Sequence, residues 1–284
     1  MLVSRIPFTE DFNVSRMQQT LQVSLARTNS ARRSRSCGPK RVVVSAASAG
    51  PSPGPRILVT GATGGTGRVL VEKLEGMSPN VAALTRNATK ARSLLPSGLE
   101  VLEGDLFDYD AARKAVEGRD VVFICSGTTN RLDPFDPVKA DWQGVNNIVA
   151  AAKQAGVRKV VLVSSIGVDD PFFPLNLPLI GNGVLWMKKL GELELQRSGL
   201  DYTIIRPGGL RSDDGKSGNV VAGKPNTFGL PPRPKLPGGI RRTTVADACI
   251  AAWELENEAR NKIIEIVEEE NAPYRTWSEL FSSV

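Results

Sequence analysis

The sequence contains no histidine among its 284 residues. It therefore cannot form a Ser-His-Asp or Cys-His catalytic set, use a histidine general base or bind a metal through imidazole. Cysteine is also scarce, with Cys37, Cys125 and Cys249 as the three examples. The two in the body of the chain provide neither a disulfide framework nor a metal site. Cys125 is interpreted as a packing residue rather than a redox thiol.

Excess positive charge is missing from most of the chain. The net formal charge is +6, but residues 1–50 hold eight of the 36 basic residues and two of the 30 acidic ones. The remainder holds 28 of each and is neutral overall. A neutral body is not expected to bind a polyanion by charge. Nucleic-acid binding is therefore the least favoured function.

The basic N-terminal segment is rich in Ser, Arg, Thr and Val and poor in acids, which is typical of a transit peptide. Val44-Ser45-Ala46-Ala47 resembles a plastid processing site. We therefore expect a chloroplast transit peptide at 1–46, a linker at 47–54 and one domain at 55–284. A mitochondrial presequence and a basic arm that stays attached are the alternatives.

Long hydrophobic runs are absent as well. No apolar stretch approaches the roughly 18 residues that a membrane-spanning helix needs. We expect a protein without a transmembrane span, either in the stroma or in peripheral contact with a thylakoid, envelope or plastoglobule surface.

Strand and helix patterns alternate from Pro55 onward, which predicts one doubly wound parallel sheet, an α/β Rossmann fold with helices on both faces. Thr244-Val245-Ala246-Asp247 is predicted to be a capping box. Segments 167–183 and 211–239 interrupt the alternation, and they are interpreted as substrate-side loops or as plain surface excursions. The expected strands are 57–60, 81–85, 100–104, 121–125, 159–164, 202–206 and 262–267, and the main helices are 138–156, 184–197, 244–254 and 277–281.

A glycine-rich turn follows the first expected strand, with Gly61, Gly64 and Gly67 spaced G-x-x-G-x-x-G. In a dinucleotide-binding turn, such glycines allow a sharp exit from the strand, close approach of a pyrophosphate and close packing of the next helix. The helix N-terminus then offers N–H groups to the phosphates. An ordinary tight turn is the alternative.

The second expected strand ends in Leu84-Thr85-Arg86-Asn87, without the acid that would bind the ribose of NAD. Arg86, helped by Arg68, suits a 2′-phosphate, so NADP is favoured with NAD as the alternative. Asp105 is a candidate for the adenine amino group, and the backbone at 207–209 for the carboxamide. The predicted cofactor-binding residues are Gly61, Thr63, Gly64, Gly65, Thr66, Gly67, Arg68, Arg86, Asp105, Leu106, Ser126, Gly127, Lys188, Pro207, Gly208 and Gly209.

These features together resemble the atypical short-chain dehydrogenase/reductases of the NmrA-like group over about residues 55–284. The matching motifs are Gly61–Gly67, Gly104-Asp105, Val163-Ser164-Ser165-Ile166-Gly167, Lys188 with Glu192, and 198–209. The likeness extends to plastid proteins related to the NAD-binding domain of the chloroplast translocon's redox subunit and to flavin-reductase-like proteins. It implies that Ser165 and Lys188 are the catalytic candidates.

One residue of the wider superfamily's Ser-Tyr-Lys set is missing. Its tyrosine precedes the lysine by four residues, and Val184 stands there in this chain. Without that phenol or a histidine, a simple ketone lacks its usual proton donor. The sequence therefore favours an NADPH-dependent reductase of a planar acceptor such as a flavin, quinone or tetrapyrrole. The alternative is a non-catalytic NADP(H)-sensing or assembly protein of the chloroplast.

Overall fold

The computed structural model describes residues 54–128, 133, 135–176, 178–212, 218–229, 235 and 238–284. The expected transit peptide at 1–46 and most of the expected linker, residues 47–53, lie outside the described residues. Among the helices in the described part of the chain, none is long and apolar enough to cross a membrane.

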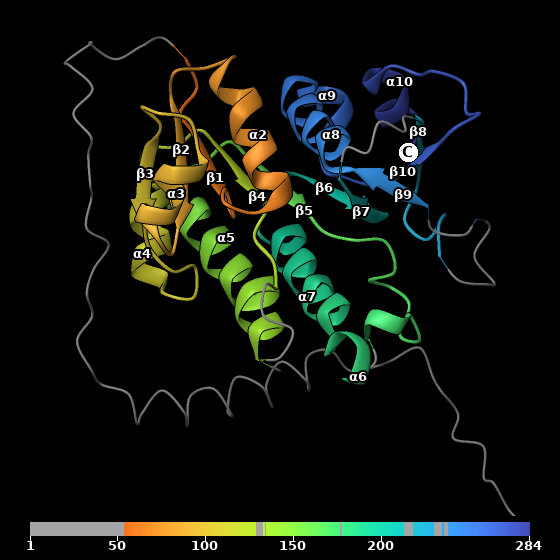
Figure 1. Ribbon diagram of the computed structural model, residues 1–284, viewed down its shortest axis with the longest axis horizontal. Helices are drawn as coiled ribbons and strands as arrows, with labels where there is room; N and C mark the ends of the chain where they lie inside the picture. Colours follow the sequence, from red (N-terminus) through yellow and green to blue (C-terminus); the bar gives the residue numbers. More distant parts are fainter. Residues whose placement is uncertain are drawn as a thin grey trace, which may run out of the picture. The chain divides into compact units, whose positions relative to one another are not determined.

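The main sheet has eight strands in the order β3-β2-β1-β4-β5-β6-β10-β8 (Figure 1). Seven strands run parallel, and β8 pairs antiparallel with β10 at one edge. The order 3-2-1-4-5-6 is that of dinucleotide-binding folds, so the predicted fold is confirmed. The strands are β1 Ile57–Thr60, β2 Val81–Thr85, β3 Glu100–Glu103, β4 Val121–Ile124, β5 Lys159–Val163, β6 Asp201–Pro207, β8 Asn219–Gly223 and β10 Lys262–Glu269.

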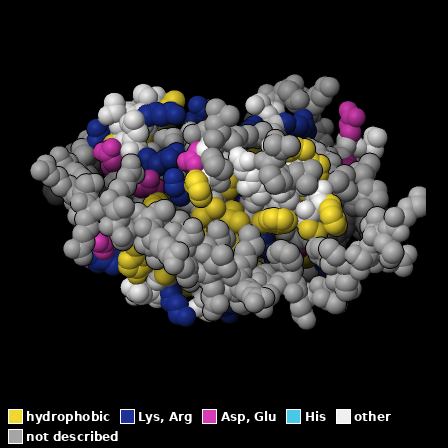
Figure 2. Space-filling model, turned by 90° about the horizontal axis from the view of Figure 1, so that it is seen from below, with side chains coloured by type: hydrophobic (Ala, Val, Ile, Leu, Met, Phe, Trp, Pro, Cys, Tyr) yellow, Lys and Arg dark blue, Asp and Glu magenta, His cyan; other side chains and the backbone are white. Residues whose placement is uncertain are grey.

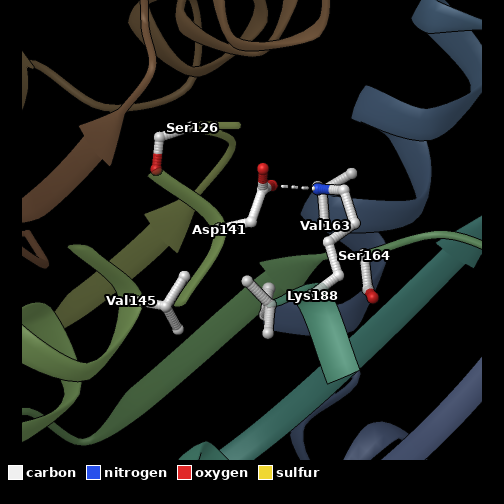
Figure 3. Close-up of a pocket in the computed structure, with 7 residues that line it drawn as sticks. Ser126, Asp141, Val145, Val163, Ser164 and Lys188 are labelled. Carbon is white, nitrogen blue, oxygen red and sulfur yellow. Dashed lines mark ion pairs between the residues drawn. The ribbon is translucent and has the colours of Figure 1, made fainter. Parts of the chain in front are cut away.

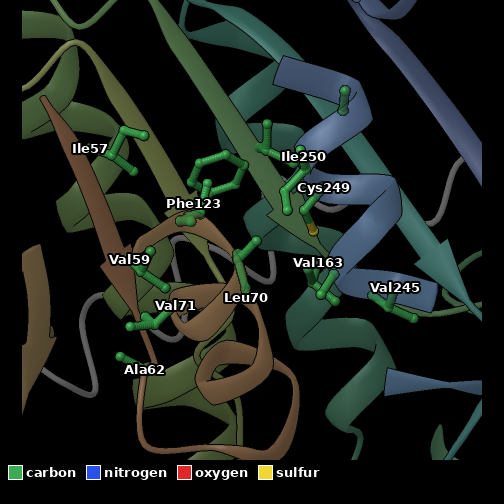
Figure 4. Packing of buried hydrophobic residues seen from close by; sticks show 14 of the residues in the cluster. Ile57, Val59, Ala62, Leu70, Val71, Phe123, Val163, Val245, Cys249 and Ile250 are labelled. Carbon is green, nitrogen blue, oxygen red and sulfur yellow. The ribbon is translucent and has the colours of Figure 1, made fainter. Parts of the chain in front are cut away.

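Helices cover both faces of this sheet, and alternate strand residues point to each layer. Ile57 and Val59 of β1 belong to one apolar cluster, and Leu58 belongs to the other. Figure 4 shows Leu70, Phe123 and Ile250 within the first cluster. The first layer holds α2 Gly65–Glu75, α3 Ala88–Leu94, α8 Arg242–Glu254, α9 Glu256–Ala259 and α10 Trp277–Ser282; the second holds α4 Tyr109–Val116, α5 Gly144–Ala155 and α7 Val184–Arg197.

The helix expected at 138–156 is divided in two. Its first part, η1 (Val138–Gln143), is a π-helix, and the remainder is α5. A π-helix accommodates an extra residue in the turn and frequently marks a functional site. Apolar spacing alone cannot distinguish it from a regular helix, since both place every third or fourth residue on the buried side.

The capping box predicted at Thr244 is wrong. α8 begins at Arg242, so Thr244 lies inside the helix, and its hydroxyl donates to the Glu268 carboxylate instead. Asp247, the expected partner in the box, forms an ion pair with Lys73 of α2 at 2.8 Å. Tertiary partners therefore outcompete the local cap. The capping box in the described residues near the C-terminus joins Thr276 to Glu279 and opens α10.

The two irregular segments contain short elements that the sequence patterns did not reveal. The first holds a 3-10 turn, η2 (Pro174–Asn176), and α6 (Pro178–Gly181). Asn176 fastens it, because its side chain donates to the Asp170 carbonyl at 2.7 Å and accepts from the Trp186 amide at 2.9 Å. The second contributes β8, and a small parallel pair, β7 (Gly209–Arg211) and β9 (Gly239–Arg241), lies at its two ends.

Candidate functional site

The glycine-rich turn lies where the strand order of the sheet reverses. β1 has β2 on one side and β4 on the other, and the chain leaves both β1 and β4 at the same carboxyl edge. The two exits are joined by a contact of 3.3 Å between the Thr60 and Ser126 hydroxyls. In open α/β sheets, ligands bind in the crevice outside such a switch point.

Gly61 can be only glycine for two separate reasons. Its φ of +68° lies in the left-handed region. A Cβ there would also lie 2.5 Å from the Ser126 amide nitrogen and 2.6 Å from the Cys125 carbonyl carbon. The turn therefore presses directly against the exit of β4, which brings Ser126 and Gly127 close to the start of α2.

The start of α2 has the features expected of a phosphate-binding helix terminus. Its N-cap is Gly64, which offers no side-chain cap, and its first turn has no acidic residue. Gly64 and Gly65 are exposed, whereas Thr66 is buried. The first N–H groups of a helix have no partner within it, and together with the helix dipole they favour an anion. These residues therefore fit the diphosphate of a dinucleotide.

A small hollow beside this turn is lined by two of the predicted residues, Ser126 and Lys188, and by others that were not predicted. Its centre is an ion pair between Lys188 of α7 and Asp141 of the π-helix, with 2.7 Å between Nζ and Oδ1 (Figure 3). Asp141 is buried and Lys188 is 19% exposed. The lining residues are Ser126, Asp141, Val145, Leu162, Val163, Ser164 and Lys188.

Asp141 connects three parts of the chain. Besides Lys188, it accepts a hydrogen bond of 3.0 Å from the Thr128 amide and another from the Thr128 hydroxyl. The backbone also passes close by, because a Cβ on Gly127 would lie 3.1 Å from Asp141 Oδ1 and 3.4 Å from Lys188 Nζ. The carboxylate thus holds the loop after β4 and the ammonium group of α7 together at the sheet edge.

Two adjacent serines follow β5, and they lie in different surroundings. Ser164 is 6% exposed, lines the hollow, and has no hydrogen-bond partner for its hydroxyl among the described residues. Ser165, the predicted catalytic serine, donates to the Ile166 carbonyl at 3.0 Å and is not among the residues that line the hollow. A buried hydroxyl without a partner is costly unless a ligand or water satisfies it. Ser164 therefore shares the site with Lys188.

The two arginines predicted to recognise a 2′-phosphate lie on different elements, Arg68 in the first turn of α2 and Arg86 directly after β2. Arg68 is half-exposed and forms a weak ion pair with Glu72 at 3.8 Å. Arg86 follows β2 and is exposed. An exposed arginine can reorient at little cost when a phosphate binds.

The remaining predicted residues, at 105–106 and 207–209, mainly form hydrogen bonds that involve backbone groups. The Asp105 carboxylate accepts from the Phe107 amide at 3.1 Å, and Asn147 of α5 holds the Leu106 carbonyl at 2.9 Å. The Gly208 and Gly209 amides already donate to the Ile266 and Gly238 carbonyls. Pro207 has no amide hydrogen, so 207–209 offers a ligand carbonyl oxygens and surface rather than free donors.

Sequence reasoning missed Asp141 and Ser164. A signal for Asp141 was present, since it is an acid on the apolar face that Val138, Trp142 and Val145 define. Buried carboxylates are rare without a charged partner, so an acid at this position predicts a nearby cationic side chain. For Ser164 no local signal distinguished it from its neighbour, because both follow the same strand.

The sequence matches the family model described as NAD(P)H-binding over residues 61–255. An uncharacterized chloroplastic protein of Arabidopsis thaliana is 35% identical, covering 81% of this chain and 82% of the relative. Sanguinarine reductase of Eschscholzia californica is 30% identical, covering 74% and 88%. Protein TIC 62 of Arabidopsis thaliana is 29% identical over 80% of this chain, which spans 38% of that protein.

Solved structures share the architecture. The anaerobillin reductase ChuY of Escherichia coli O157:H7 is 25% identical with a TM-score of 0.58, covering 77% of this chain and 99% of the other. These relatives confirm the resemblance that the sequence motifs indicated.

Proposed function

This chain belongs to the NAD(P)H-binding family, among the atypical short-chain dehydrogenase/reductases, and we propose that it is an NADPH-dependent reductase of a planar acceptor. Flavins, quinones and tetrapyrroles are the acceptor classes that we favour. The observation that carries the proposal is the Lys188–Asp141 pair beside the Ser164 hydroxyl, which has no hydrogen-bond partner among the described residues. It lies at the sheet edge where the family binds its nucleotide.

Each part of the site has a distinct task in this proposal. The turn at Gly61–Gly67 binds the diphosphate, and Arg86 binds the 2′-phosphate. Lys188 hydrogen-bonds the nicotinamide ribose, and Asp141 keeps its ammonium group directed into the hollow. Bound NADPH supplies the hydride. Ser164 or Ser165 orients an oxygen atom of the acceptor.

Planar acceptors are favoured because the site lacks the usual proton donor. Val184, four residues before Lys188, has no hydroxyl, and no histidine exists to replace it. Quinones and flavins accept hydride readily and can take their proton from solvent. Two relatives carry names of reductases that act on extended conjugated molecules, sanguinarine and anaerobillin. These names support the acceptor class for this chain.

The segment between Gly167 and Gly183 supplies apolar surface for such a ligand. Phe172 is 75% exposed and Ile180 is 54% exposed. Figure 2 shows apolar side chains gathered on the face that lies at the foot of Figure 1, where α6 is found. A flat, apolar acceptor would remove such side chains from water on binding. We propose that this segment covers the acceptor.

We also propose that the protein works in the chloroplast. The basic segment at 1–46 and the chloroplastic relatives support this location. The stroma and a peripheral position on a plastid membrane are both consistent with a chain in which no described helix could cross a bilayer.

The proposal is tested on the purified full-length chain. NADPH binding is measured by calorimetry, and its oxidation is followed with FMN, a benzoquinone and biliverdin as acceptors. We expect binding and turnover with at least one acceptor, and a loss of turnover of tenfold or more in Lys188→Met. Ser164→Ala and Ser165→Ala form a matched pair, of which the first should lose more activity. Absence of NADPH binding would refute the proposal outright.

A second function is favoured by one observation, the valine in place of tyrosine at 184. A protein that binds NADPH but reduces none of these acceptors would fit a redox sensor or assembly protein. In that case a pull-down should recover different partners in the presence of NADPH and of NADP. Identical partners would argue against the sensor.

A further inference from the structure

Arg242, the first residue of α8, lies directly against Gly65, the first residue of α2. A Cβ on Gly65 would lie 2.6 Å from Arg242 Nε and 2.7 Å from its Cδ. The absence of a side chain at Gly65 therefore leaves the space that the arginine occupies. The two helices also meet further along, where Lys73 of α2 pairs with Asp247 of α8. They consequently run in the same direction and begin at the same edge of the sheet.

This arrangement brings positive charge together at the starts of two helices. Both helices present their positive ends here, and neither has a side-chain cap or an acidic residue in its first turn. Cations are unfavourable at a helix N-terminus, where acids are normally found. Without a bound anion, an arginine at this point raises the free energy of the folded protein. It becomes favourable when an anion lies between the two helix ends and the guanidinium.

The neighbouring arginine shows the contrast. Arg241 Nε donates to the buried Glu268 carboxylate at 2.9 Å, so its charge is neutralised. Arg242 is half-buried and forms no hydrogen bond or ion pair with any residue in the described part of the chain. Its planar group of N–H donors is suited to two-point binding of a phosphate. One arginine of the pair is structural, and the other is available to a ligand.

We propose that Arg242 binds the diphosphate bridge of the dinucleotide above the first turn of α2. The assignment rests on the proposed function, since it takes a nicotinamide dinucleotide as the ligand. Its contact with Gly65 places it at the helix terminus that receives the diphosphate. Arg86, by contrast, follows β2, where the adenosine ribose is recognised in this fold. Arg242 therefore serves NAD and NADP alike, whereas Arg86 discriminates between them.

The test compares Arg242→Gln with the wild-type full-length chain by calorimetric titration of NADP and of NAD. Glutamine keeps the side chain as far as Cδ and removes the charge. We expect the Kd for both nucleotides to rise about tenfold or more. Inorganic pyrophosphate should compete with NADP on the wild type and more weakly on the variant. Arg158→Gln is the matched control, because this exposed arginine precedes β5 at the opposite edge.

A second measurement separates binding from a structural role. Without nucleotide, Arg242→Gln should melt at the same temperature as the wild type or higher, because it removes a cation from two helix N-termini. A lower melting temperature, an unchanged Kd, or a loss for NADP alone would each overturn the assignment. A wild type that binds neither nucleotide refutes the proposed function instead, and so the two failures are distinguishable.

Discussion

Arg206 of β6 and Glu192 of α7 form a two-point ion pair inside the protein, with 2.9 Å between Nε and Oε1 and 2.6 Å between Nη2 and Oε2. Arg206 is 1% exposed and Glu192 is fully buried. Nη1 of the same arginine reaches Asp169 at 2.6 Å and Glu265 at 3.5 Å. One guanidinium thus joins α7, β10 and the segment after β5. It also fixes the helix that carries Lys188.

Arg206→Gln should be severely destabilising, because three carboxylates would lose their common cation. Removing one partner of a buried ion pair costs about 3–5 kcal/mol. The control is Arg158→Gln, whose arginine is 62% exposed and 3.8 Å from Asp120; exposed pairs contribute about 0–1 kcal/mol. Urea unfolding at neutral pH measures both. Equal unfolding midpoints for the two variants would contradict the role assigned to Arg206.

Acid should weaken the same cluster through Asp169. Burial raises the pKa of this carboxyl, but Arg206 and Lys189 more than offset it, and the pKa lies below its usual value. An unfolded aspartate titrates near pH ~3.9. The stabilisation is therefore complete above about pH 4 and is lost as the pH falls through the lower folded-state value.

The measurement is the free energy of unfolding of Asp169→Asn and the wild type as a function of pH. The variant should be less stable at neutral pH, and the difference should shrink on acidification below about pH 4. Asp110→Asn, at a position where the side chain is 74% exposed, is the control. A constant difference across the acid range would show that the charge of Asp169 does not stabilise the fold.

Asp141→Asn should impair the candidate site with little change in packing. The amide keeps an acceptor for Thr128 but removes the negative charge that holds Lys188 at 2.7 Å. We expect the Kd for NADPH, or the turnover with the best acceptor, to worsen about tenfold. Calorimetry and steady-state assays check this, again with Asp110→Asn as the control. Unchanged binding and turnover would mean that Lys188 needs no partner.

The two cysteines of the domain should differ sharply in reactivity. A hydrogen bond with Cys125 and complete burial raise the pKa of Cys249 well above its ordinary value. Since the thiolate is the reactive form, Cys249 should resist iodoacetamide at mildly alkaline pH. Cys125 is half-buried and should react first. Peptide mass spectrometry before and after urea treatment gives the order, and equal native labelling of both would disprove it.

Arg86→Ala tests the nucleotide preference. If Arg86 binds the 2′-phosphate, the substitution should weaken NADPH binding by about tenfold and leave NADH binding nearly unchanged. Calorimetric titration of both nucleotides measures the ratio. An equal loss for both nucleotides would remove the assignment, and it would leave Arg68 as the remaining candidate near the turn.

The sequence was most informative where one local pattern suffices. Continuous apolar runs between polar residues predicted β1 and β2 to the residue, and Val184–Arg197 was predicted as the helix now labelled α7. The glycine turn was also predictable, because both the backbone angle at Gly61 and its close neighbours require a residue without a side chain. The edge strand β8 was not, since a short strand beside Gly and Pro residues resembles a loop.

The site was less predictable, because its parts come from distant segments. The contacts of Arg242 with Gly65 and of Lys188 with Asp141 exist only after the sheet has assembled. The start of α8 was misjudged for the same reason, since the Thr244 hydroxyl found a partner 24 residues away. Residue type indicated which groups were available for chemistry. Tertiary structure decided which of them meet.

The π-helix η1 makes the site sensitive to chain length. Each residue of a regular helix turns the side chains by about 100°. Deleting one residue just after Asp141, and so restoring an ordinary helix, would keep α5 in place while turning the carboxylate away from Lys188 and Thr128. The composition and fold of such a chain would hardly change. Only the direction of the side chain at position 141 would change. We therefore expect the segment to tolerate substitutions better than single-residue deletions.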